Sequence, residues 1–169
     1  LLDGSCYFDS GIIPDLDTNT ELKMQVNSGP YLAGARDAGY KYGVTVTDNF
    51  YAVRGTVSSA AKSAVFWSAD WVIKQIGNKA VFNSSEVDLD AAESLSLTTT
   101  YYIGNMNNDG SAYTGQGLVG RIYYVKIFSG SDLVRDMVPV KKSDGSLCMY
   151  DKVTKAYYMN LGTGTLRES

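Results

Sequence analysis

Short runs in which apolar and polar residues alternate constrain the fold of this chain more than any other feature. In residues 21–27 the apolar positions Leu22, Met24 and Val26 are separated by charged or amide side chains. Residues 40–47 repeat the pattern with Tyr40, Tyr42, Val44 and Val46. Successive side chains of a strand point to opposite faces of a sheet, so each run is typical of a half-buried β-strand.

Further β-rich runs follow along the chain, divided by Gly, Asn, Asp and Ser. We expect strands at 7–12, 50–54, 71–76, 79–83, 98–104, 118–128, 147–151 and 156–159. Hairpins are expected at Gly77-Asn78 and around 152–155, and the long run 118–128 should contain a bulge. Only residues 57–66 could be helical, although serines weaken that interpretation.

This arrangement predicts an all-β fold, an antiparallel β-sandwich of two curved sheets in which the first strand lies near the C-terminal hairpin. The sequence shows no boundary or linker, and its 169 residues suit a single domain over 1–169. A chain of this length can bury a core without disulfides or metals.

Composition excludes several classes of function. The formal net charge is -3, which argues against nucleic acid as a partner because such partners need clustered positive charge. No run of 18 apolar residues occurs, so we expect no membrane insertion. Histidine is absent, which removes the commonest general base and the usual zinc ligand.

The two cysteines, Cys6 and Cys148, lie far apart in the sequence and form no CxxC pair or metal-binding spacing. A disulfide would require the two ends of the chain to meet. The sequence favours two buried or partly buried free thiols.

The C-terminal third carries a resemblance to a known family. Residues 118–128 read LVGRIYYVKIF, and residues 132–139, 142–145, 149–152 and 157–164 follow in a characteristic order. Residues 7–12 and 101–105 fit the first strand and a strand that precedes a loop rich in Asn and Gly. The series resembles concanavalin A-like (laminin-G-like) jelly-roll domains of gut-bacterial surface proteins and of phage tail or neck proteins.

The resemblance implies a non-catalytic, lectin-like carbohydrate-binding module that recognises a polysaccharide or glycan. It also implies that the module is tethered to other domains of a larger protein, which is extracellular, at a cell surface or in a virion. The same fold also serves as a structural or protein-interaction module, which is the alternative.

The Arg135-Asp136 pair and the tyrosines near Asp151 are interpreted as structural.

One segment raises a catalytic hypothesis. Glu86, Asp88 and Asp90 would share one face of a strand, and β-glucanases of this fold carry a similar Glu-x-Asp-x-Glu strand. In that reading Glu86 is the nucleophile and Asp90 the acid/base of a retaining glycosidase. Here the third acid is shorter and the aromatic flanks are missing, so we expect no enzyme activity.

The segment Asn105–Gly110 is similar to the first half of a calcium loop, because oxygen-bearing side chains alternate before a glycine. Gln116 stands where such loops use glutamate. Calcium is therefore possible, but a plain polar turn is favoured, and no other cofactor is expected.

Sugar sites combine flat aromatic rings with a few polar side chains. The chain holds 13 tyrosines, and Tyr31, Tyr51 and Arg36 belong to the wider candidate set. Trp71 is expected in the core, whereas Trp67 lies in a turn-like context that could expose its ring or bury it. The site is expected on the concave sheet or on rim loops that include 105–117, with these contacts: Tyr40, Tyr42, Arg54, Trp67, Asn107, Asp109 and Tyr113.

Overall fold

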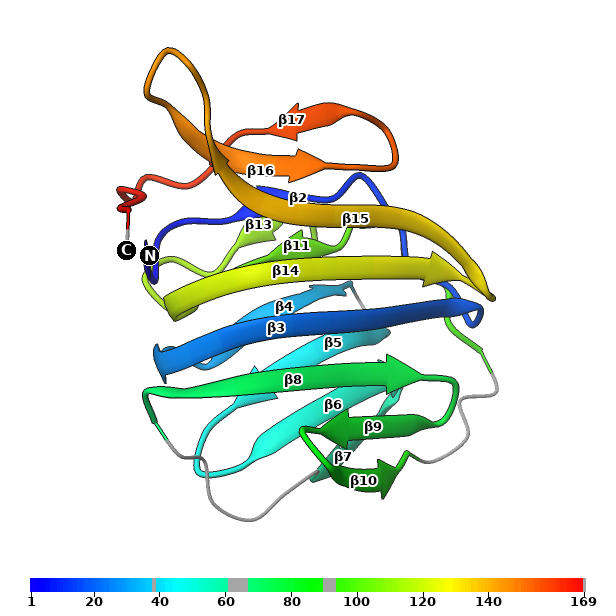
Figure 1. Ribbon diagram of the computed structural model, residues 1–169. Coiled ribbons are helices and arrows are strands. Elements are labelled where there is room, and N and C mark those ends of the chain that lie inside the picture. The colour runs from blue at the N-terminus through cyan, green and yellow to red at the C-terminus, as the bar shows by residue number, and fades with distance from the viewer. Residues whose placement is uncertain (38, 61–66, 90–93, 169) are drawn as a thin grey trace.

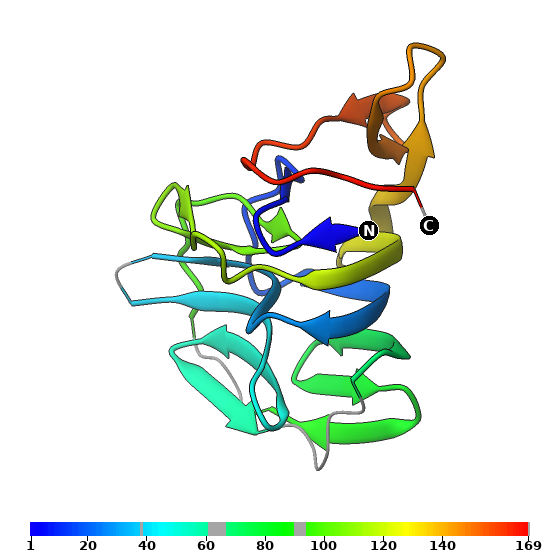
Figure 2. The same ribbon diagram turned by 90° about the vertical axis from the view of Figure 1, so that its left-hand side faces the viewer.

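The protein is a β-sandwich of two sheets, seen face-on in Figure 1 and from the side in Figure 2. The computed structural model describes residues 1–37, 39–60, 67–89 and 94–168, and of residues 57–60 only the backbone. None of the described residues forms a helix, so none forms a helix that could cross a membrane. The predicted all-β sandwich is confirmed.

The front sheet, nearest the viewer in Figure 1, is built around two long neighbouring strands, β3 (Thr18–Ser28) and β14 (Val119–Ser129). On one side of β3 follow β8 (Ala69–Ile76), β9 (Lys79–Phe82) and β10 (Ser85–Asp88). Beyond β14 lie β15 (Asp132–Lys141), β16 (Leu147–Asp151) and β17 (Ala156–Tyr158), and β1 (Leu2–Asp3) also pairs with β14.

The back sheet runs in the order β13 (Ser111–Ala112), β12 (Met106–Asn108), β4 (Tyr31–Arg36), β5 (Lys41–Val46), β6 (Phe50–Gly55) and β7 (Val57–Ala60). The short β11 (Tyr102–Ile103) pairs with both β4 and β2 (Phe8–Asp9). Neighbouring strands are antiparallel in both sheets except for β4 and β12, which are parallel.

The core lies between the sheets and follows the alternation in the sequence. Leu22, Met24 and Val26 on β3 face Tyr42, Val44 and Val46 on β5 across the interior, and all six are buried. Trp71 is also buried, with its ring 4.6 Å from that of Phe50, as expected of a core residue.

Several expectations need correction. The possible helix at 57–66 is wrong for residues 57–60, which form β7 and pair with β6, while 61–66 lie outside the described residues. The strand expected at 7–12 covers only Phe8–Asp9, and the strand expected at 98–104 covers only Tyr102–Ile103. The N-terminal segment does lie beside the chain's end, because Leu161 N donates to Tyr7 O at 2.9 Å.

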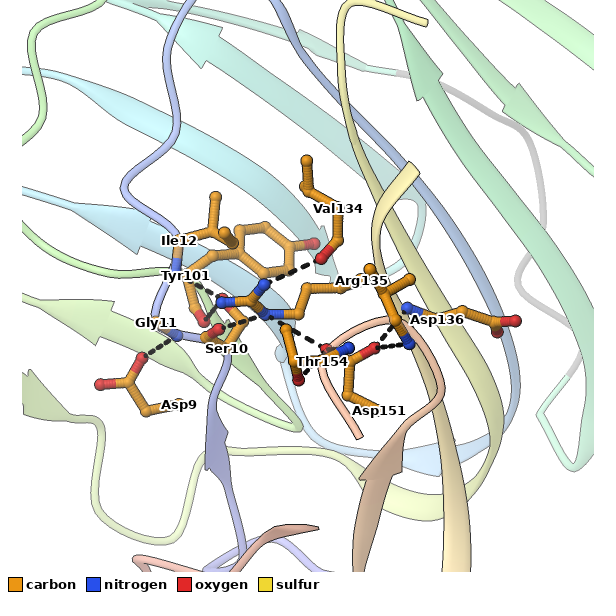
Figure 3. Close-up of polar contacts among 11 residues, drawn as sticks. Asp9, Ser10, Gly11, Ile12, Tyr101, Val134, Arg135, Asp136, Asp151 and Thr154 are labelled. Carbon is orange, nitrogen blue, oxygen red and sulfur yellow. Dashed lines mark hydrogen bonds and ion pairs between the residues drawn. The ribbon is translucent and has the colours of Figure 1, made fainter. Parts of the chain in front are cut away.

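The charged residues Arg135 and Asp151 join the N-terminal segment to the front sheet (Figure 3). Asp151 is fully buried, and its carboxylate accepts hydrogen bonds from the Asp136, Val153 and Thr154 amides and from the Thr154 hydroxyl. Arg135 Nε lies 3.7 Å from Asp151 Oδ2 and donates to Ser10 O at 3.0 Å. The structural interpretation of Arg135 is confirmed.

Both cysteines are free and buried, as predicted. Burial raises the pKa of Cys6 to about 11, and it raises the pKa of Cys148 as well. Since the thiolate is the reactive form, we expect the folded protein at neutral pH to react with a disulfide reagent at least about tenfold more slowly than the unfolded chain. Titration in denaturant without reductant should find two thiols per chain, and finding none would mean that the cysteines are bonded.

Candidate functional site

A hollow of about 210 Å³ lies on the outer face of the back sheet, and we call it the sheet hollow. Tyr42 and Val44 of β5 point into the core, so the alternate positions Lys41, Gly43 and Thr45 face outward. On β4 the residues opposite these three are Arg36, Gly34 and Tyr31. The hollow is lined by Tyr31, Arg36, Lys41, Thr45, Tyr51, Val53 and Met106.

Two glycines lie between these side chains in the β4–β5 pair. Gly34 lies directly opposite Gly43 in the β4–β5 ladder. A Cβ on Gly43 would lie 2.3 Å from Ala33 O, and a Cβ on Gly34 would lie 2.8 Å from Met106 Cε. Larger residues at these positions would therefore collide with their neighbours.

A pair of stacked tyrosines stands at one side of the sheet hollow. The rings of Tyr31 and Tyr113 are 4.2 Å apart with an interplanar angle of 12°. Arg36 Nη1 donates to the Tyr113 hydroxyl at 3.0 Å, which ties the rim loop to β4. Burial, followed by the neighbouring Tyr113, raises the pKa of Tyr31, so its hydroxyl stays protonated and can donate a hydrogen bond at neutral pH.

The described lining residues include two cations and no acid. Arg36 and Lys41 are half-buried and stand directly opposite each other on β4 and β5. Neither forms an ion pair with any described residue. Asp37 is adjacent in sequence, but its carboxylate accepts hydrogen bonds from the Thr98 amide and hydroxyl.

Tyr113 lines a second hollow of about 280 Å³, the rim hollow, between the 105–115 segment and the C-terminal segment. Tyr7, Asn105 and Leu161 contribute to it as well. A third hollow of similar size lies beside the two ends of the chain and includes Leu2, Phe8 and Cys148. Of these three hollows, the sheet hollow combines two tyrosines with cations that form no ion pair with a described residue.

Three of the sites predicted from the sequence are wrong, because their side chains serve the fold. Tyr42 is fully buried and its hydroxyl donates to Thr18 O at 2.9 Å. Arg54 is buried and its guanidinium donates to Gly77 O and Leu16 O. Asn107 is buried and closes the 107–110 turn by accepting from Gly110 N at 2.8 Å.

The other four predicted contacts are accessible to different degrees. Tyr113 adjoins the sheet hollow, and Asp109 is exposed in the turn after β12, where its amide donates to Arg36 O. Tyr40 is half-buried against the core, and Trp67 is 47% exposed. Neither Tyr40 nor Trp67 lines the sheet hollow or the rim hollow.

The acidic segment of the catalytic hypothesis forms the edge strand β10. Glu86 and Asp88 share its exposed face, and Glu86 forms an ion pair with Lys79 of the adjacent strand. Asp90, the hypothetical acid/base, lies outside the described residues.

The Asn105–Gly110 segment uses its side-chain oxygens internally. Asn105 Oδ1 accepts from Met106 N at 2.7 Å, as Asn107 Oδ1 does from Gly110 N. Among the residues that the structure describes, no three acidic, cysteine or histidine side chains cluster as metal ligands would. The segment comprises β12 and the turn that follows it at 109–110.

Sequence reasoning missed Lys41 and gave Tyr31, Tyr51 and Arg36 only as members of a wider set. The signal was present in residues 40–47, where alternation puts Lys41 on the face opposite Tyr42. Which outward residues of separate strands come together depends on the pairing of β4, β5 and β6, which the pattern within one strand does not determine.

Comparison with solved structures finds a similar fold. The crystal structure of "a putative carbohydrate binding protein from Bacteroides ovatus" aligns with a TM-score of 0.62 at 12% sequence identity. The alignment covers 97% of this chain and 58% of that one, so the chain spans little more than half the length of the Bacteroides protein. No protein-family model matches the sequence, and none of the curated proteins does.

Proposed function

We propose that this domain is a non-catalytic carbohydrate-binding module and that its saccharide lies in the sheet hollow. The observation that carries the proposal is a group of three tyrosines, because Tyr31 and Tyr51 line the hollow and Tyr113 stacks on Tyr31. Flat rings suit the apolar C–H faces of a sugar, and the hydroxyls and cations around them suit its oxygen atoms. The name of the Bacteroides protein of similar fold supports the same reading.

The proposal extends to the setting of the domain. We place it in the concanavalin A-like group of jelly-roll modules, as part of a larger protein that is extracellular, at a cell surface or in a virion. Its partner would be a glycan rather than nucleic acid. A shallow hollow offers little apolar area to each sugar ring, so we expect dissociation constants of about 10 µM to 1 mM.

A structural or protein-interaction module is the second candidate, and one observation favours it. The C-terminal hairpin and the segment after it expose Val153, Tyr157, Met159 and Leu161, each at 43% or more. Exposed apolar residues that lie close together on a surface often indicate a protein contact.

A glycan array that covers plant, host and bacterial-wall sugars, with and without calcium, tests the first candidate. We expect saturable binding to at least one glycan class and no requirement for calcium. If no class binds, the carbohydrate proposal is wrong and the interaction module should replace it.

For the glycan that binds best, we expect Tyr51→Ala to weaken affinity about five- to thirtyfold, because the loss of one stacking ring is worth roughly 1–2 kcal/mol. Tyr113→Ala should act in the same direction. Tyr157→Ala, which removes an exposed ring from the front sheet, is the matched control and should leave binding unchanged. Trp67→Ala should also leave it unchanged, and a loss there would move the site to the β7–β8 connection.

A further inference from the structure

We infer that the sheet hollow is selective for an anionic saccharide, in which a carboxylate or sulfate of the sugar is bound between Arg36 and Lys41. This inference rests on the proposed function and names the class of sugar. It starts from the like-charge pair on β4 and β5.

Arg36 and Lys41 occupy a cross-strand position that costs stability in the free protein. They are directly opposite partners in the antiparallel ladder, and both side chains face outward into the same hollow. Like charges in this arrangement repel each other, whereas opposite charges would stabilise the pair. An anion between the two groups converts the repulsion into two attractive contacts.

No described carboxylate relieves the repulsion. The six ion pairs of the described residues involve other cations, and Asp37 is held by Thr98. The backbone of Asp109 lies beside Arg36, but its exposed carboxylate forms no ion pair with the guanidinium. This local positive charge occurs in a chain whose formal net charge is -3.

The geometry leaves the guanidinium available for a ligand. One nitrogen of Arg36, Nη1, donates to the Tyr113 hydroxyl, which fixes the side chain at the wall of the hollow. The remaining N–H groups can donate to a planar carboxylate or to a sulfate, and the flexible Lys41 ammonium can approach from the opposite strand. The tyrosine rings next to them would hold the sugar that bears the acid.

Paired oligosaccharides that differ only in charge test the inference. Titration calorimetry would compare galacturonate, glucuronate and alginate oligosaccharides with their carboxyl-reduced forms, and a sulfated oligosaccharide with its desulfated form. We expect at least one anionic member to bind roughly tenfold more tightly than its neutral partner, because hydrogen bonds to charged groups are stronger than those between neutral groups. This preference should shrink at about 0.5 M salt. The carboxylate and sulfate arms show which acid is bound.

Lys41→Gln should reduce the preference to a few-fold, while Lys41→Arg should restore it. Lys23→Gln is the matched control, because Lys23 is a half-buried cation beside Tyr123 on the front sheet. Equal affinities for charged and neutral partners would overturn the inference and leave the proposed function standing. A charge preference that survives in the double variant Arg36→Gln/Lys41→Gln would also overturn the inference. Failure to bind any saccharide would instead overturn the proposed function.

Discussion

Asp151→Ala is expected to lower the free energy of unfolding by about 3 kcal/mol, because it removes a buried carboxylate that four groups hydrogen-bond. The Asp136 amide and the turn after β16 would lose their acceptor, and Arg135 would lose its nearest carboxylate. Urea unfolding measures the effect. The control is Asp132→Ala, an exposed carboxylate on β15, which should change stability by less than about 0.5 kcal/mol.

The same site predicts the direction of a pH dependence. Burial by itself raises the pKa of Asp151, but the hydrogen bonds from Thr154 and from the backbone outweigh it, so the pKa lies below its usual value. The ionised form therefore stabilises the fold at pH above the unfolded value of about 3.9, and this contribution is lost as the pH falls through the lower folded value. Asp151→Ala should flatten that part of the stability profile. A variant that keeps the wild-type slope would show that other carboxylates cause it.

Gly120→Ala is expected to cost about 3 kcal/mol or to prevent folding. A Cβ at this position would lie 2.0 Å from Gln25 O, which is backbone of the neighbouring β3 and cannot move without breaking the β3–β14 ladder. The register of that ladder shifts between Val119 and Gly120, so the glycine lies at a bulge.

Gly39→Ala provides the comparison for this substitution, because a Cβ there would meet no described atom within 4 Å apart from its neighbours in the chain. It should leave the urea midpoint nearly unchanged. Equal stability of Gly120→Ala and Gly39→Ala would contradict the close approach of β14 to β3.

Alternation identified strands that bury one face. The alternation in 21–27 and 40–47 marked β3 and β5, and the bulge expected in 118–128 occurs in β14. β4 was missed because Leu32, Ala33, Gly34 and Ala35 are all buried, which erases the alternation. β15 was missed because most of it is exposed or half-buried, so it shows no apolar face.

The site was harder to predict for a related reason. Residue type favoured Tyr42 and Arg54 as ligand contacts. Tyr42, however, alternates with Val44 and Val46 on the buried face of its strand, and its hydroxyl donates to a backbone carbonyl. Arg54 is a buried donor to two carbonyls. Alternate residues of a strand face the core and the surface, so the position of Lys41 next to the buried Tyr42 would have identified it as an outward residue. The meeting of Tyr31, Arg36 and Lys41 with Tyr113, by contrast, depends on the β4–β5 register and on a rim loop far away in the sequence.

Backbone amide hydrogen exchange with and without a saturating saccharide from the array tests most directly whether the sheet hollow is the binding site. We predict slower exchange in 31–36, 41–55 and 113–117 when the saccharide is bound, and no change in β16 and β17 of the front sheet. Protection confined to the front sheet or to the C-terminal hairpin would contradict the account.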